Sequence, residues 1–131
     1  MSEKEFPLED ITNKIKNISL EPEIRFCGLI DSDGELITGQ FKTGIIPLEN
    51  DSRRRQMFQE LAHRVANRTN FDANLGRVKY SASRREEVVM MSFPIGKYII
   101  MVVAEPSVNI DRLGWKIIDK LGQQWSEFQG F

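Results

Sequence analysis

The sequence holds one histidine, His63, and one cysteine, Cys27. Histidine is the commonest general acid–base group near neutral pH, and a nucleophilic cysteine needs a basic neighbour that lowers the pKa of its thiol. Cys27 stands in an apolar run in which Arg25 is the nearest base, and His63 falls between Ala62 and Arg64 on the polar side of a predicted helix. We therefore expect a buried, inert thiol, a surface histidine, and no hydrolytic or redox activity.

Residues 31–35, with the sequence Asp-Ser-Asp-Gly-Glu, superficially resemble the start of a calcium-binding loop. Such a loop places a glycine at its sixth position and a carboxylate at its twelfth. Here Gly34 stands at the fourth position and Lys42 at the twelfth, so the pattern instead predicts a turn between two strands. The sequence also lacks a glycine-rich phosphate loop, a Gly-x-Ser-x-Gly elbow and a paired-cysteine zinc motif. We expect no metal, no cofactor and no enzymatic activity.

The formal net charge is only −1, but the middle of the chain is basic. Residues 51–87 carry nine basic and five acidic side chains, among them the run Arg53, Arg54 and Arg55. Nucleic-acid-binding domains usually combine a stronger basic excess with interleaved aromatic residues. A nucleic-acid accessory role, which would add Arg84 and Arg85 to this run, is therefore the weakest function that we consider.

The apolar segments of the chain are short. The longest runs, residues 88–91 and 98–104, are far below the roughly 20 residues that span a bilayer. The charged start of the chain, Met-Ser-Glu-Lys-Glu, precedes no apolar stretch of signal-peptide length. A single cysteine also excludes an intramolecular disulfide and is typical of a reducing compartment. We expect a cytoplasmic protein that does not insert into membranes.

Apolar periodicity predicts the elements that position these residues. Helices are predicted over three segments: residues 8–18, a segment capped by Asp51 or Ser52, and a long segment capped by Asn109 that extends through Trp125 and Phe128. Strands are predicted over five segments: residues 24–30, 36–41, 78–83, 88–93 and 98–104. The order α-β-β-α-β-β-β-α indicates one α/β domain of the α+β type over residues 1–131, with a core at about residues 8–128. Its five-stranded sheet is expected to be mostly antiparallel, because most connections are of hairpin length, with the three helices on its faces.

The middle helix and the loop before it have unusual apolar content. Six apolar side chains cover about half the circumference of the helix, at about 100° per residue; they are Met57, Phe58, Leu61, Ala62, Val65 and Ala66. Such a wide arc predicts contact with two neighbours. In the preceding loop, Ile45, Ile46 and Leu48 either tuck into the core or form an exposed patch beside the arginine run, and the sequence leaves both alternatives open.

Gly114 and Gly122 lie near one side of the last predicted helix. Each lowers helix propensity by about 1 kcal/mol relative to alanine, so a packing reason is expected. Close approach to the sheet or to the first helix is one explanation. A cavity for a small metabolite between the sheet and this helix is another, and it defines our second functional hypothesis, a ligand-sensing domain of the profilin-like type.

Two segments, at matching places in the order of elements, carry a resemblance to a known family. Residues 27–37, Cys-Gly-Leu-Ile-Asp-Ser-Asp-Gly-Glu-Leu-Ile, are similar to the first hairpin of the roadblock family. Residues 108–114, Val-Asn-Ile-Asp-Arg-Leu-Gly, are similar to the start of that family's last helix. The apolar loop, the arginine run and the long last helix depart from the family pattern. We interpret the chain as a divergent, archaeal branch of the roadblock family without an assigned role.

This resemblance implies a scaffold or regulatory module of the kind found among dynein light chains and regulators of small GTPases. Roadblock domains dimerise through equivalent edge strands and through their second helices. The resemblance, together with the wide apolar arc, implies these dimer-interface residues: Met57, Leu61, Arg64, Val65, Arg68, Val78 and Tyr80. A small GTPase is the expected partner, and these residues are candidates to contact it: Ile45, Ile46, Leu48, Arg53, Arg54 and Arg55.

Overall fold

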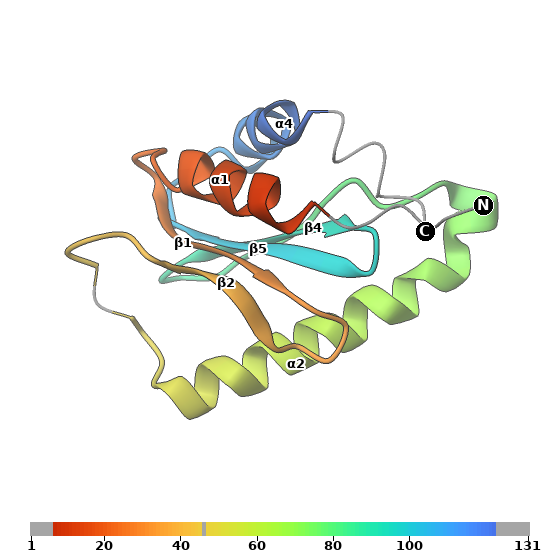
Figure 1. Ribbon diagram of the computed structural model, residues 1–131, viewed down its shortest axis with the longest axis horizontal. Helices are drawn as coiled ribbons and strands as arrows, with labels where there is room; N and C mark the ends of the chain where they lie inside the picture. Colours follow the sequence, from red (N-terminus) through yellow and green to blue (C-terminus); the bar gives the residue numbers. More distant parts are fainter. Residues whose placement is uncertain (1–6, 46, 123–131) are drawn as a thin grey trace.

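The computed structural model describes residues 7–45 and 47–122, which form a central sheet with helices on both of its faces (Figure 1). The spatial order of the strands is β2-β1-β5-β4-β3, and all neighbouring pairs are antiparallel. The strands are β1 (Ile24–Ile30), β2 (Leu36–Phe41), β3 (Ser81–Arg84), β4 (Val89–Ile95) and β5 (Tyr98–Ala104). The central strands β1, β5 and β4 are almost entirely buried because both of their faces are covered.

Two helices cover one face of the sheet. The first, α1 (Leu8–Ile18), buries Ile11, Ile15 and Ile18, whose spacing places them on one side of a helix. The last, α4 (Ile110–Leu121), begins at its cap Asn109, whose side chain accepts a hydrogen bond from the backbone N–H of Arg112. Both helices pack against the larger of two apolar clusters, which also contains the β1, β4 and β5 side chains of that face.

Ion pairs fasten the connection between α1 and β1 to α4. The carboxylate of Glu21 lies 3.0 Å from Lys116 Nζ and 3.0 Å from Lys120 Nζ. Glu23 accepts a hydrogen bond of 2.9 Å from Arg112. The two lysines lower the pKa of Glu21, because they favour its ionised form. Ion pairs at the edge of this face, as well as apolar packing, therefore hold α4 in place.

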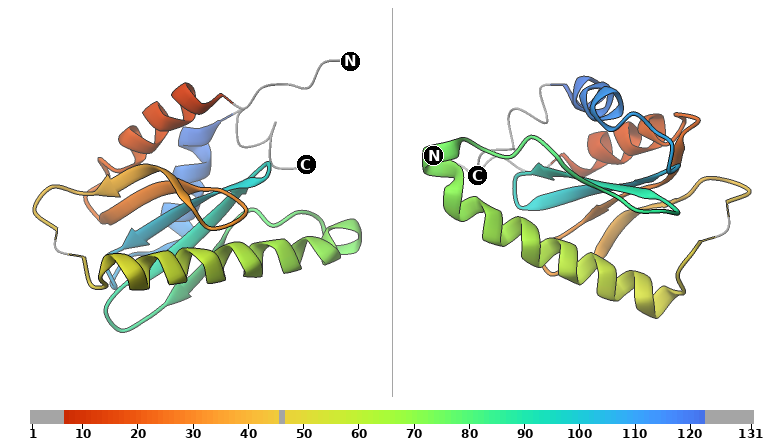
Figure 2. Two further views of the ribbon diagram at one scale, coloured as in Figure 1. Left: turned by 60° about the horizontal axis from the view of Figure 1, so that its bottom comes forward. Right: turned by 180° about the vertical axis from the view of Figure 1, so that it is seen from behind.

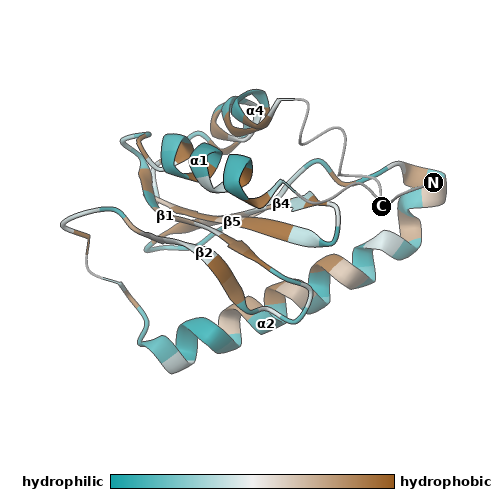
Figure 3. Cartoon of the chain, in the orientation of Figure 1, coloured by the Kyte–Doolittle hydropathy of each residue, from teal (hydrophilic) through white to brown (hydrophobic). Residues whose placement is uncertain are grey.

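Of the helices in the described part of the chain, the long helix α2 (Asp51–Arg68) packs on the other face (Figure 2). Its buried residues Phe58, Leu61 and Ala62 pack in a second apolar cluster with sheet residues that include Phe26 and Met101. Figure 3 shows that α2 is hydrophilic at its N-terminal end and less so towards its middle. Its C-terminal end extends past the sheet, where a 3-10 turn (Thr69–Phe71) and the short helix α3 (Asp72–Leu75) follow (Figure 1).

The predicted order of the main elements and the five-stranded sheet are confirmed. The third strand is shorter than predicted, because residues 78–80 form no strand pairs and β3 begins at Ser81. The 3-10 turn and α3 were not predicted, since so short a segment carries no periodic pattern. The last helix ends at Leu121, where Gly122 has a φ of +59°. The predicted continuation through Trp125 and Phe128 lies outside the described residues.

Candidate interaction site

A groove runs between α2 and the edge strand β3. Three hollows follow one another along it, lined by the N-terminal half, the middle and the C-terminal end of α2 in turn. We call it the α2–β3 groove. It exists because α2 packs mainly against β1 and β5, and no residue of β3 belongs to the apolar cluster beneath it. The side chains of Leu61, Arg64 and Arg68 line its middle, opposite β3 residues that include Ala82 and Ser83.

The strand beside this groove has an open edge. Among residues 7–45 and 47–122, β3 pairs with β4 on one side and with no strand on the other. The backbone N–H of Arg85 donates to the carbonyl of Val88 on the adjoining segment. Because inward and outward groups alternate along an antiparallel strand, the N–H groups of Ala82 and Arg84 point away from β4. These groups are available to another strand.

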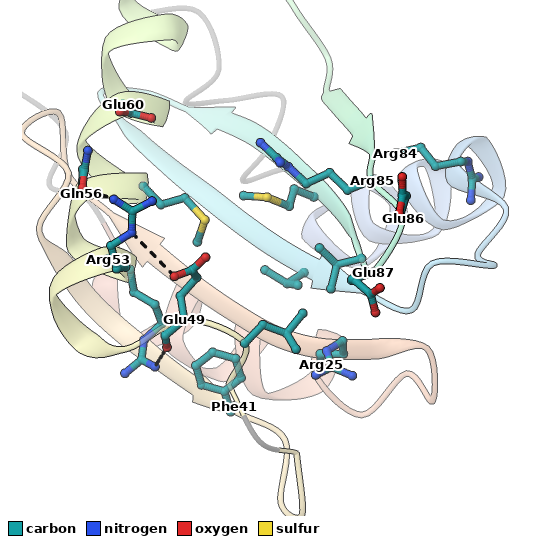
Figure 4. Close-up of a pocket in the computed structure, with 16 residues that line it drawn as sticks. Arg25, Phe41, Glu49, Arg53, Gln56, Glu60, Arg84, Arg85, Glu86 and Glu87 are labelled. Carbon is teal, nitrogen blue, oxygen red and sulfur yellow. Dashed lines mark hydrogen bonds and ion pairs between the residues drawn. The ribbon is translucent and has the colours of Figure 1, made fainter.

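The N-terminal hollow, which we call the N-terminal cavity, has a volume of about 860 Å³ and an apolar floor (Figure 4). Its floor comes from β2, α2, β4 and β5 and from the residue before β4: Phe41, Met57, Val88, Met90 and Val103. Charged and polar side chains form its rim: Glu49, Arg53, Gln56, Glu60, Arg85, Glu86 and Glu87. Figure 4 shows Arg85 reaching over the cavity towards α2, while Arg84 points away from it.

The three consecutive arginines of α2 point to different partners. Arg53 lies 3.7 Å from the carboxylate of Glu49 at the cavity rim. Arg54 pairs with Asp51, and its guanidinium lies 5.2 Å from the centre of the Phe41 ring. Arg55 pairs at 2.6 Å with Glu35 in the β1–β2 connection. Consecutive helix positions diverge by about 100°, so the run forms no single cationic patch.

Most of the sequence-predicted interface residues meet along the α2–β3 groove. Met57 lines its N-terminal cavity, and Leu61, Arg64 and Arg68 line its middle. Val65 and Val78 line the hollow at the C-terminal end of α2. Arg68 also donates a hydrogen bond of 2.5 Å to Ser81 Oγ at the start of β3.

Tyr80 lies apart from this set, on the face that α4 covers. Its ring packs against Phe93, with 5.9 Å between ring centres, and its hydroxyl donates to Asp111 in the first turn of α4. A Cβ on Gly114 would come within 3.0 Å of the Tyr80 ring, so this glycine allows the tyrosine to approach the helix. The ring occupies the space beside Gly114, one of the two glycines at which the metabolite hypothesis placed a cavity. Gly122 is explained by its positive φ at the end of α4.

The loop residues have different environments. Ile45 is half-buried, whereas Leu48 is 59% exposed at the edge of the N-terminal cavity. Ile46 lies outside the described residues. Ile45 belongs to neither apolar cluster, so its partial burial does not place it in the core. Among the described residues of this loop, Leu48 adds an open apolar surface next to the arginine run.

The structure buries one of the two single-copy residues and exposes the other. Cys27 is fully buried, and desolvation raises the pKa of its thiol to about 12. His63 is exposed on α2 and lines a shallow hollow with neighbours from its own helix. Among the described residues, no three metal-ligating side chains come together. No helix in the same part of the chain has the length and apolar character to cross a membrane.

Sequence reasoning missed part of the groove. Met90 and Val103 form the cavity floor, and residues 85–87 form its rim on the β3 side. The alternation of side chains along β4 and β5 could have predicted which of their residues lie on the same face of the sheet. It could not show which part of that face α2 leaves open, because this depends on where the helix crosses the sheet.

The arrangement of the elements is that of a roadblock-type, profilin-like fold. A Roadblock/LC7 domain from Streptomyces avermitilis superposes with a TM-score of 0.64 at 10% identity, over 86% of this chain and 92% of that one. The gliding protein MglB from Thermus thermophilus gives 0.67 at 14% identity, over 97% and 96%. Profilin IA from Acanthamoeba castellanii gives 0.55 at 15% identity, over 92% and 98%. The fold predicted from the sequence is thereby confirmed.

At the level of sequence, the chain belongs to the family described as a family of unknown function, DUF6659, whose model matches residues 3–131. No curated protein matches it by sequence. The roadblock likeness is therefore carried by the three-dimensional arrangement, at identities of 10% to 16% with the roadblock-type structures.

Proposed function

We propose that the protein is a non-enzymatic, homodimeric module of the roadblock type that scaffolds or regulates a small GTPase. The observation that carries the proposal is the open edge of β3 beside the α2–β3 groove. An unpaired strand edge leaves backbone groups that another strand can satisfy. A second copy that adds its own β3 to this edge would also bring its α2 to the groove. One dimer contact would therefore pair the open strand edge and cover the groove.

A two-fold symmetric contact suits the residues on this edge. The side chains of Ala82 and Ser83 are exposed, and neither is bulky enough to prevent a second strand from approaching. Two β3 strands related by a two-fold axis pair antiparallel and in register with each other. One MglB structure of the same fold is described as having a tetrameric arrangement, which supports self-association in this fold.

The dimer is tested by its mass and by a substitution at the open edge. Sedimentation equilibrium at micromolar concentration should return twice the chain mass. Ala82→Pro removes an N–H that points away from β4, so it should weaken the dimer while β3 stays paired within its own sheet. Ala82→Val keeps the N–H and is the matched control. A monomeric wild-type protein would refute the dimer.

The choice of a small GTPase rests on the roadblock resemblance of the sequence. The surface that we assign to it is the N-terminal end of α2 with the preceding loop. There Leu48 is exposed, and Arg53 and Arg55 point outward with exposed side chains. An apolar residue next to separated cations suits a partner surface of mixed apolar and acidic character.

Titration of GTPases from the source organism, in GTP-analogue and GDP forms, tests this assignment. Leu48→Asp should weaken binding, whereas Leu20→Asp changes an even more exposed leucine in the α1–β1 connection and should not. Failure of every GTPase to bind would refute the partner class. Equal binding by the wild type and the Leu48 variant would remove the loop from the contact.

The non-enzymatic part of the proposal rests on the environments of Cys27 and His63. The thiol is buried with a raised pKa, and the exposed histidine lines a shallow hollow with side chains of its own helix. We expect the purified protein alone to hydrolyse neither nucleotides nor ester substrates. Activity that persists after repeated purification, and that is lost on a substitution in the groove, would overturn this part.

A further inference from the structure

The segment that follows α2 exposes two large apolar side chains. It comprises the 3-10 turn and α3, residues 69–75, and we call it the α2 tip. Phe71 is 63% exposed and Leu75 is 80% exposed. The tip projects beyond the sheet, away from both apolar clusters (Figure 1). Two such side chains on one short, ordered segment form a compact apolar surface, and surfaces of this kind mark interaction sites.

The N-terminal cavity, at the other end of the same helix, is an apolar hollow that none of the described residues of its own chain fills. Its volume of about 860 Å³ falls in the range, roughly 300–1,000 Å³, of pockets that enclose whole small molecules. Two side chains the size of phenylalanine and leucine therefore fit. Tip and cavity cannot meet within one chain, because the 18 residues of α2 separate them, a rise of about 27 Å.

Two-fold symmetry brings the two features together, and this step rests on the proposed homodimer. Ala82 and Ser83, at the middle of β3, line the same hollow as Leu61 and Arg64, in the middle part of α2. A single axis perpendicular to β3 can therefore pass close to both centres. About such an axis both strands and helices run antiparallel, so the α2 tip of each copy comes to the N-terminal end of the other copy's α2.

We propose that Phe71 and Leu75 of each copy enter and close the N-terminal cavity of the other. The dimer then has two composite apolar sites, each with its floor from one chain and its cover from the other. The cavity floor, which includes Met57 and Met90, is adaptable, because methionine side chains fit irregular apolar partners. Closure removes the apolar surface of both tip and cavity from water.

The charges around the two features complement each other. Within the described part of the chain, Asp72 on the tip and Arg77 just beyond it form no ion pair. About the same axis, residues after β3 of one copy face residues before β3 of the other. Arg77 thus approaches Glu86 and Glu87 of the second copy. A rim that carries both signs fits a mixed-charge protein segment better than a strongly anionic small ligand.

Directed cross-linking between two differently tagged chains tests the placement. One chain carries Leu75→Cys and the other carries Gln56→Cys, at the cavity rim; both are expressed together and treated with a short bis-maleimide. The native Cys27 is fully buried and does not compete. We expect covalent dimers that join the two tags. Leu75→Cys paired with Leu20→Cys, and Leu75→Cys paired with itself, should give none.

A second measurement follows the strength of the dimer. The double variant Phe71→Ala/Leu75→Ala should raise the dimer dissociation constant at least about tenfold, since each truncation removes buried apolar area. Both residues are exposed in the single chain, so its fold should be unchanged by circular dichroism. Leu20→Ala, at a leucine that is 76% exposed elsewhere, is the matched control and should leave the constant unchanged.

The outcomes separate this inference from the proposed function. A monomeric wild type refutes the homodimer itself. A stable dimer without the 56–75 cross-link, with dissociation unaffected by the double variant, refutes the tip-in-cavity contact and leaves the homodimer standing. A cross-link only between two Leu75→Cys chains places the tips side by side and also refutes it.

Discussion

Gly34 in the β1–β2 turn lies directly against the backbone of Gln59 in α2. A Cβ on Gly34 would stand 2.6 Å from the Gln59 Cα and 2.7 Å from its backbone N. The turn also has a φ of +83° at this glycine, and the Glu35–Arg55 ion pair lies beside it. The Asp-Ser-Asp-Gly sequence that marks a hairpin thus also allows the β1–β2 turn to pack closely against α2.

Gly34→Ala should therefore lower the free energy of unfolding by about 2–4 kcal/mol, from left-handed backbone strain together with a clash against rigid helix backbone. Gly44→Ala is the matched control, because Gly44 has a similar φ of +86° but a Cβ at this position would meet no atom within 4 Å. It should cost about 1–2 kcal/mol, the strain alone. Urea unfolding of both variants measures the difference, and equal losses would contradict the clash.

Leu61→Arg should destabilise the fold by several kcal/mol. The leucine is buried in the cluster between α2 and the sheet, and an arginine would place an unpaired charge there. His63→Ala, two positions along the same helix but exposed, should change stability by less than about 0.5 kcal/mol. Thermal unfolding of the two variants compares them. If the two variants have the same melting temperature, the assignment of the buried side of α2 is wrong.

Stability should fall at alkaline pH through Tyr80. Its hydrogen bond to Asp111 and its desolvation raise the pKa of the tyrosine. A group with a raised pKa in the folded state contributes stability that is present below its unfolded pKa and is lost as pH rises through the folded pKa. The free energy of unfolding should therefore drop above about pH 10. Tyr80→Phe should flatten this part of the profile, and an unchanged slope would contradict it.

Glu21 should have the opposite effect at acidic pH. Lys116 and Lys120 lower its pKa, so its contribution to stability is present above the unfolded pKa and is lost as pH falls through the folded pKa. Glu21→Gln should lower the free energy of unfolding at pH 7 by up to about 1 kcal/mol, the size expected of a partly exposed ion pair. The difference from the wild type should vanish at low pH, as followed by urea unfolding. A constant difference would assign the effect to packing instead.

The order of the elements and most of the core follow from the sequence alone. The spacing of Ile11, Ile15 and Ile18 predicts the buried side of α1, and the Asp-Gly turn predicts the first hairpin, because both signals depend on neighbours within a few residues. The absence of a second histidine or cysteine likewise follows from composition. The roadblock resemblance also came from local motifs in their order along the chain.

How these elements meet depends on the tertiary structure. Tyr80 was grouped with the dimer residues from its place in a predicted strand, but the structure turns it towards α4, where Gly114 makes room for its ring. The cavity joins Met57 with Val103, and the exposure of Phe71 and Leu75 depends on how far α2 overshoots the sheet. Local periodicity indicates which side of an element is apolar. It does not state what lies opposite, because that is set by contacts between residues distant in the sequence.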